Sequence, residues 1–222
     1  MARGAARREL TFLQRGWRMK VLVVYYSRYG HVLKLARAVA KGAESVEGVE
    51  AVLRRAAEFP DAEEEIKRDE YALPVWKEQQ GIGVCTLDDL RQADAVVWGT
   101  PTRFGNMAAQ MKRIFDSAAP LWLEGALEGK PTGVFTSTAT THGGQETTIL
   151  ATMIPLLHLG MIFVGVPYST PGMLHTEGRG GTPYGPSTVA GSSNELQPTA
   201  EDLGIAEALG RRVAEVATKL RG

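Results

Sequence analysis

Hydroxyl side chains and glycines gather in three short segments of this 222-residue chain. The first segment runs from Ser27 to Val32, the second from Pro101 to Asn106, and the third from Ser137 to Glu146. Hydroxyl groups and the free amides at the start of a helix bind phosphate. Phe104 adds an aromatic face to the second segment. One phosphate loop with two further loops around a flat, hydrogen-bonding ring is the outline of a site for flavin mononucleotide (FMN).

The first segment follows a run of β-branched, aliphatic and aromatic residues from Val21 to Tyr26. The run shows no alternation, which predicts a central parallel strand buried on both faces. From Val32 onward, apolar residues recur at helical spacing, with charged residues on the opposite side. A strand, a short turn with Gly30 and a helix can hold an anion at the helix start. They can equally form an ordinary tight turn, and the turn alone does not decide between the two.

The remaining elements alternate in the same way, so we expect a doubly wound α/β domain with five parallel strands and three layers. Thr86 and Asp89 predict a capping box, and Asn106 is the expected cap of a later helix. In such sheets, ligands bind beyond the carboxyl ends of the strands, where the three segments lie. The further strands are expected at 49–54, 95–98, 133–135 and 161–164, and the helices at 32–44, 86–93, 107–115, 145–158 and from 199. Residues 165–198 show no periodicity and are interpreted as a long loop.

Two other nucleotide-binding patterns are absent from the sequence. Residues 125–130 resemble a Gly-x-x-x-x-Gly-Lys motif but are one residue short, and Pro131 follows. No Gly-x-Gly-x-x-Gly pattern follows the first strand. A phosphate site of hydroxyls and backbone amides, without lysine, favours a bound mononucleotide over a kinase or an ATPase.

Composition narrows the function classes. The formal net charge is zero and the pI is about 6.9, so nucleic-acid binding is not indicated. A single cysteine, Cys85, excludes an internal disulfide framework and indicates a reducing, cytoplasmic setting. No apolar run approaches the roughly 20 residues of a membrane span, so stable membrane insertion is not expected. The four histidines lack the spacing of metal ligands.

Residues 1–18 differ from the rest of the chain, because they hold five arginines and only one glutamate. We interpret them as an extension outside the domain, arising from an upstream start codon. Met19 would then be the true first residue, and the FMN-binding domain would span 19–222. A transit peptide is the other interpretation of an arginine-rich, acid-poor start.

Six pieces of sequence, in order, carry a family resemblance. They are Val-Leu-Val-Val-Tyr-Tyr-Ser-x-Tyr-Gly-His at 21–31, Gly-Thr-Pro-Thr-Arg-Phe-Gly-Asn-Met at 99–107, Leu-Trp at 121–122 with Gly-Ala-Leu at 125–127, Gly-Gly-Gln-Glu at 143–146, His158 with Gly160-Met161, and Arg-Gly-Gly-Thr-Pro-Tyr-Gly at 179–185. Through them, residues 19–222 resemble the WrbA family of flavodoxin-like NAD(P)H:quinone oxidoreductases (type IV). The first loop departs from the flavodoxin form, since Tyr29 and Val32 replace two threonines.

The resemblance implies a role for individual residues. The FMN phosphate would be held by Ser27, Arg28, Tyr29, Gly30, His31 and Val32. The flavin ring would be lined by Thr102, Arg103, Phe104, Ser137, Thr138, Ala139, Thr140, Thr141 and His142, with His158 also in its pocket. Tyr29 would also meet the nicotinamide nucleotide, and Trp122 would flank the substrate. Without the resemblance, Trp122 reads as a packing residue and His158 as a histidine at a helix end.

The resemblance also implies an activity. NADH or NADPH would reduce FMN, and small quinones would then be reduced by two electrons to hydroquinones in a ping-pong hydride transfer. No side chain is expected to act as a nucleophile. A flavodoxin-type electron carrier, or an interaction protein that has lost its cofactor, remains the alternative. The resemblance also suggests a homotetramer, and the sequence fits one with pockets completed across subunits. Apolar residues that could form an interface crowd around His158, namely Met153, Leu156, Leu157, Leu159 and Met161.

Overall fold

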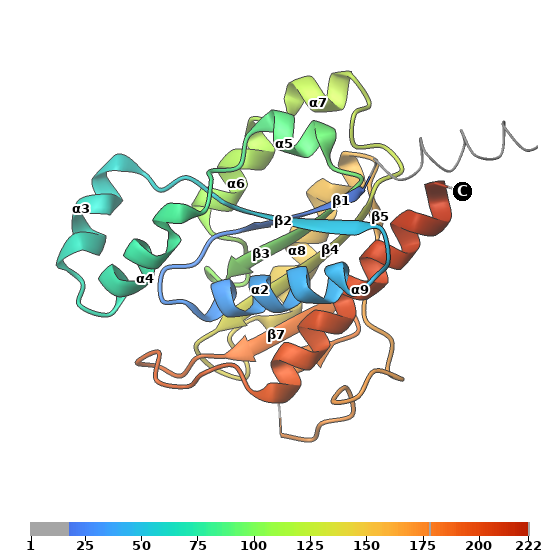
Figure 1. Ribbon diagram of the computed structural model, residues 1–222. Helices are drawn as coiled ribbons and strands as arrows, with labels where there is room; N and C mark the ends of the chain where they lie inside the picture. Colours follow the sequence, from blue (N-terminus) through green and yellow to red (C-terminus); the bar gives the residue numbers. More distant parts are fainter. Residues whose placement is uncertain (1–17, 178, 222) are drawn as a thin grey trace, which may run out of the picture.

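The computed structural model describes residues 18–177 and 179–221 (Figure 1). Its centre is a sheet with the strand order β2-β1-β3-β4-β7-β6, in which β5 also pairs with β4. All pairs are parallel except β6 with β7. The strands are β1 (Met19–Tyr25), β2 (Val49–Arg55), β3 (Ala95–Pro101), β4 (Pro131–Thr138), β5 (Ile162–Phe163), β6 (Gly181–Thr182) and β7 (Gly185–Val189).

Helices cover both faces of the sheet, so the predicted three layers and doubly wound parallel sheet are confirmed. One core cluster joins β1 to α2 and α9, and a second joins the other face to α5, α6, α7 and α8. Figure 1 shows α3 and α4 beyond the edge of the sheet, near the start of α2. The helices are α2 (His31–Glu44), α3 (Pro60–Arg68), α4 (Ala72–Glu78), α5 (Leu87–Gln92), α6 (Ala109–Asp116), α7 (Ala119–Leu123), α8 (Gln145–His158) and α9 (Ala200–Arg221), with a 3₁₀ turn at Gln79–Gly81.

The central strands form where the apolar runs predicted them. Every residue of β1 from Val21 to Tyr25 is fully buried, as is β3 from Ala95 to Val97. Tyr25 pairs with Gly99, so β1 and β3 end at nearly the same level. β2 lies at the sheet edge, as its alternating pattern indicated. This arrangement places the carboxyl ends of β1 and β3, and the loops that follow them, side by side.

The fifth position of the sheet differs from the prediction. β5 covers only Ile162–Phe163 and pairs with the start of β4, whereas β7 pairs with its end. The segment interpreted as one long loop, 165–198, therefore contains β6 and β7. The sequence hid β7 because the strand begins with Gly185 and Pro186, and its other buried residues, Ser187 and Thr188, are polar. Ser187 donates a hydrogen bond to Gln145, and Thr188 donates one of 2.7 Å to Asp202.

Local helix signals gave mixed results. The capping box is confirmed, since the Thr86 hydroxyl accepts from the Asp89 amide while the Asp89 carboxylate accepts from the Thr86 amide. The predicted Asn106 cap is wrong. Asn106 pairs with Arg103 in a tight turn, and α6 begins only at Ala109, with Ala108 as its cap. The Asn106 backbone is thus engaged before the helix starts.

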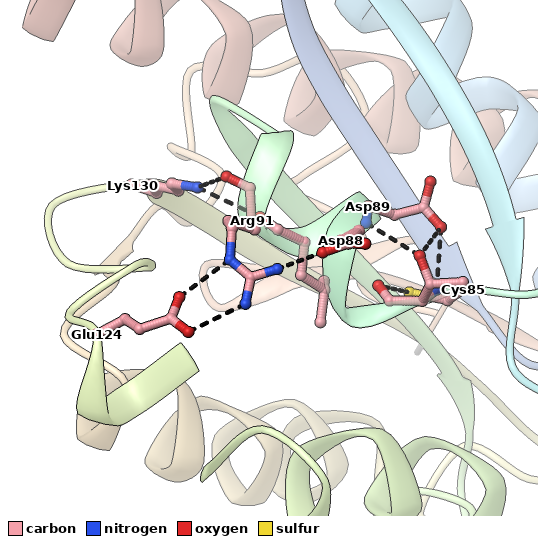
Figure 2. A network of polar contacts seen from close by, with 8 residues as sticks. Cys85, Asp88, Asp89, Arg91, Glu124 and Lys130 are labelled. Carbon is pink, nitrogen blue, oxygen red and sulfur yellow. Dashed lines mark hydrogen bonds and ion pairs between the residues drawn. The ribbon is translucent and has the colours of Figure 1, made fainter. Parts of the chain in front are cut away.

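Polar contacts fix α5 against the turn before β4 (Figure 2). Arg91 donates from Nε and Nη2 to the two carboxylate oxygens of Glu124, at 3.0 and 3.1 Å. Lys130 Nζ donates to the carbonyl oxygens of Leu90 and Arg91, at 3.2 and 2.8 Å.

Burial raises the pKa of the Cys85 thiol to about 12, so this cysteine stays protonated and packs rather than reacts. No helix within the two described ranges has the length and apolarity to cross a membrane.

Candidate functional site

The three hydroxyl-rich segments meet at the carboxyl ends of β1, β3 and β4. The Tyr26 amide donates to the Gly99 carbonyl oxygen at 3.0 Å, and the Thr102 amide donates to the Ser137 carbonyl oxygen at 2.9 Å. Between them lies a cavity of about 150 Å³. Its walls come from all three predicted segments and from the chain after β7, and are Ser27, Arg28, Tyr29, His31, Val32, Pro101, Thr102, Arg103, Ser137, Thr138, Ala139, Ala190 and Asn194.

The first segment forms a tight entry into α2. Gly30 precedes the helix with φ 92°, a conformation that glycine adopts without steric cost. Its amide donates to the Ser27 Oγ at 3.1 Å. No side chain in the described part of the chain caps α2, and the amides of its first turn have no partners within the helix itself. The buried Ser27 hydroxyl and these amides lie at one end of the cavity, and donors of this kind are suited to an anion.

Arg28 is the cation of this segment. Its Nε is buried and has no hydrogen-bond partner among the described residues, while its Nη2 donates to Asp69 at 3.4 Å. The Tyr29 hydroxyl donates to the same Asp69 oxygen at 3.1 Å. Burial would raise the pKa of Asp69, but hydrogen bonds from the Ala72 amide, Tyr29, the Tyr71 amide and Arg28 hold it below its ordinary value. Asp69 is therefore charged at neutral pH.

The second segment turns back on itself. The Arg103 amide donates to the Asn106 carbonyl oxygen at 2.7 Å, and the Asn106 amide returns a bond of 3.1 Å. Phe104 and Gly105 form the tip with φ values of 53° and 78°, as a type I′ turn requires. Phe104 is fully exposed, although a positive φ is unfavourable for a bulky residue. Such strain in a surface aromatic next to the cavity-lining Arg103 is typical of a functional position.

The third segment divides into two parts. Ser137, Thr138 and Ala139 line the cavity. The Thr138 hydroxyl donates to the Thr140 carbonyl oxygen at 2.8 Å. Residues 140–142 have exposed side chains and lie outside the cavity wall. Their predicted flavin contacts would therefore have to form outside this cavity.

Sequence reasoning missed the wall contributed by the chain after β7, with Ala190 and Asn194. This segment is tied to α2, because the buried His31 donates from Nε2 to the Leu196 carbonyl oxygen at 2.8 Å. Burial lowers the pKa of His31, so the ring is neutral at physiological pH. The only signal in the sequence was Asn194, a residue type that tolerates the left-handed conformation it adopts here, with φ 62°.

Trp122 and His158 lie apart from this cavity. Both line a separate groove of about 690 Å³ between α6, α7 and α8. The Trp122 side chain is 59% exposed, and the neighbouring Ile154 and Leu157 are exposed as well. Of the residues expected to crowd around His158, Leu156 and Met161 are buried in the core and add nothing to this surface. Asn106, the last residue of the second segment, also lines this groove, but within one chain the groove and the cavity share no lining residue.

The residues of the cavity fit one end of FMN. Hydroxyl groups, helix amides and the unpaired Nε of Arg28 are suitable donors to a phosphate. The volume is below the roughly 300 Å³ that a small-molecule pocket usually provides. A flavin ring would therefore extend beyond the walls that this chain supplies. Among the described residues, no cluster of histidine, cysteine, aspartate or glutamate side chains could hold a metal ion.

Comparison with known proteins agrees with this geometry. Residues 19–172 match the family described as NADPH-dependent FMN reductase. The chain is 52% identical over 203 residues to an NAD(P)H dehydrogenase (quinone) of Syntrophobacter fumaroxidans, covering 91% of this chain and 98% of the relative. It is 50% identical over 207 residues to the protein of that name from Geobacter sulfurreducens, covering 92% of this chain and all of the relative.

A solved structure described as a flavodoxin, WrbA-like protein from Agrobacterium tumefaciens is similar throughout. Its TM-score is 0.61 at 26% identity, with 90% of this chain and 98% of that chain covered. A flavodoxin from the domain Archaea, at 20% identity and a TM-score of 0.56, shares the fold. The chain thus belongs to the NADPH-dependent FMN reductase family, as a flavodoxin-like oxidoreductase whose cofactor is FMN.

Proposed function

We propose that this protein reduces small quinones to hydroquinones by two electrons, with NADH or NADPH as the donor and FMN in the cavity between β1, β3 and β4. The observation that carries the proposal is the meeting of three predicted segments around the uncapped start of α2. The names of the relatives that are about half identical over nearly the whole chain support the substrates. A cytoplasmic setting follows as part of this proposal.

In this proposal the protein binds and orients, and FMN carries the redox chemistry. When bound, FMN would supply the two-electron chemistry by which a hydride from the nicotinamide and a proton from solvent convert the quinone to a hydroquinone. Ser27, Arg28 and the first amides of α2 hold the phosphate. The hydroxyls of Thr102, Ser137 and Thr138 line the path toward the ring. Because the donor and the quinone need the same open face, they bind in turn, which is a ping-pong sequence.

The active unit in this proposal is a homotetramer. One chain leaves the flavin ring partly uncovered, and its Trp122–His158 groove faces outward with exposed apolar residues. Exposed apolar patches of this kind mark interfaces. A neighbouring copy would bring this groove over the ring, so that Trp122 flanks the quinone and His158 lies at the flavin. Closed symmetry then gives equivalent sites, with D2 a common arrangement for four chains.

A steady-state assay tests the proposal. Purified protein with FMN, NADH and benzoquinone should consume NADH well above background and give parallel double-reciprocal lines. NADH consumption at background would instead favour an electron carrier. Colourless protein that takes up no added FMN would favour a cofactor-free interaction protein. Mass spectrometry of the released flavin checks the cofactor, because FAD in place of FMN would contradict the phosphate site.

A further inference from the structure

We propose that Asp69, which lies outside all three FMN segments, is a positioning residue that sets the affinity for the FMN phosphate through Arg28. The inference rests on the phosphate position proposed above. Asp69 follows α3 in a stretch so rich in charged residues that its sequence indicates only a solvated surface. The structure gives this one carboxylate two sets of partners.

One oxygen of Asp69 holds the phosphate loop. Its Oδ2 accepts from Arg28 Nη2 at 3.4 Å and from the Tyr29 hydroxyl at 3.1 Å. The other oxygen, Oδ1, accepts from the Tyr71 and Ala72 amides at the start of α4, both at 3.0 Å. The carboxylate therefore connects two consecutive residues of the phosphate loop to the backbone of α4.

A second contact joins the same two parts of the chain. The buried Gln79, just after α4, donates from Nε2 to the Ser27 carbonyl oxygen at 3.1 Å and to the Val75 carbonyl oxygen at 3.0 Å. Val75 also lies opposite Gly30, 3.4 Å from the position a Cβ atom would take there. The region from Asp69 to Gln79 thus supports the back of the loop from Ser27 to Gly30.

The chemistry of the loop explains why Arg28 needs this support. Tyr29 and Val32 leave the loop with Ser27 as its one aliphatic hydroxyl, and the neighbouring His31 is neutral. Arg28 is then the one positive charge in the loop that can pair with a phosphate. A free guanidinium loses considerable side-chain entropy when it is ordered by a ligand. Asp69 lowers that cost by holding Arg28 before FMN arrives, and Nε keeps no hydrogen-bond partner among the described residues.

Riboflavin is FMN without the phosphate. Comparing the binding of the two flavins therefore distinguishes an effect of Asp69 on the phosphate from a general effect on the structure. Dissociation constants of both flavins would be measured by titrating the apoprotein of the wild type, Asp69→Ala and Asp69→Asn. We expect Asp69→Ala to raise the Kd of FMN about tenfold and to leave the Kd of riboflavin unchanged. Asp69→Asn should have a smaller effect, because its amide oxygen still accepts hydrogen bonds. The control, Glu64→Gln on the exposed face of α3, should change neither Kd.

A double-mutant cycle identifies Arg28 as the link. In the Arg28→Ala background, Asp69→Ala should cause no further loss of FMN affinity. An equal loss of both flavins, or an unchanged FMN affinity in Asp69→Ala, would overturn the inference. Additive losses in the cycle would overturn the link to Arg28. If the wild type binds riboflavin as tightly as FMN, the phosphate position itself is wrong, which is a separate result.

Discussion

The ring of His31 is hydrogen-bonded from Nε2 to the carbonyl oxygen of Leu196 at 2.8 Å, which connects the first residue of α2 to the chain after β7. Both segments line the cavity proposed to bind FMN, through His31 on one side and Asn194 on the other. Burial is the main cause that lowers the pKa of His31; the Leu196 bond opposes this shift, and Lys34 adds to it. Protonation keeps the Nε2 donor, so the cost at low pH is that of burying a charged ring, not the loss of the Leu196 hydrogen bond.

This pKa shift predicts a pH dependence of stability in the apoprotein. The unfolded chain protonates His31 near its ordinary pKa of about 6.5, and the folded chain only at lower pH. The contribution of neutral His31 to the free energy of unfolding is therefore fully present above the unfolded-state pKa of about 6.5. It is lost as the pH falls through the pKa of His31 in the folded protein. Urea unfolding at several pH values should show that the free energy of unfolding declines less steeply with falling pH in His31→Gln than in the wild type. The control, His175→Gln, should decline as the wild type does. An unchanged decline in His31→Gln would contradict the assignment.

Gly210 predicts a packing limit between α2 and α9. A Cβ atom there would lie 1.9 Å from the Val39 carbonyl oxygen, whereas one at Gly204 in the same helix would meet nothing within 4 Å. Gly210→Ala should lower the free energy of unfolding by about 3 kcal/mol through overpacking. Gly204→Ala should raise it by roughly 0.5 kcal/mol, because alanine favours the helix. Urea denaturation compares them, and equal effects would argue against this close crossing.

The fold followed from the sequence wherever burial follows hydrophobicity. The run from Val21 to Tyr26 and the Thr86–Asp89 box both gave correct elements. β7 was missed because Ser187 and Thr188 are buried through hydrogen bonds, which leave no apolar pattern. Asn106 misled because a side chain suited to capping also suits a turn.

The parts of the candidate site that directly follow strand ends could be predicted from the sequence. The parts contributed by segments distant in the sequence could not. The three loops follow directly from the strand ends, so most of the cavity wall was found. Asp69 and Ala190 reach the site only through the tertiary arrangement of α4 and β7. Trp122 and His158 were expected at the flavin, yet one chain places them in another groove. In the proposed tetramer, a neighbouring copy would bring this groove to the flavin.

The proposed tetramer predicts that charge in the Trp122–His158 groove blocks assembly. Ile154→Glu would bury a carboxylate at the interface, so dissociation should occur at a concentration about tenfold higher or more. FMN affinity and specific activity should fall along the same dilution series. Leu220→Glu, at an equally exposed position on α9, is the control and should assemble normally. Sedimentation with parallel activity measurements follows both. A fully active wild-type monomer would refute the shared pocket.

Residues 1–18 are proposed to lie outside the working domain. Residues 1–17 fall outside the described part of the chain, and β1 begins at Met19, whose amide donates to the Gly48 carbonyl oxygen at 2.8 Å. A protein that starts at Met19 should keep the FMN Kd and the turnover of the full chain within about twofold, a difference of less than 0.5 kcal/mol. Titration and steady-state kinetics measure the two quantities. A large loss of either would show that the extension contributes to the site.

The most direct measurement is an anaerobic double-mixing stopped-flow experiment on the FMN-loaded protein. One equivalent of NADH should bleach the yellow flavin absorbance completely. The oxidised nucleotide should then leave the protein. A second mix, with one equivalent of benzoquinone, should restore the flavin absorbance completely. If NADH leaves the absorbance unchanged, or if benzoquinone fails to restore it, the protein is not a two-electron quinone reductase working through FMN.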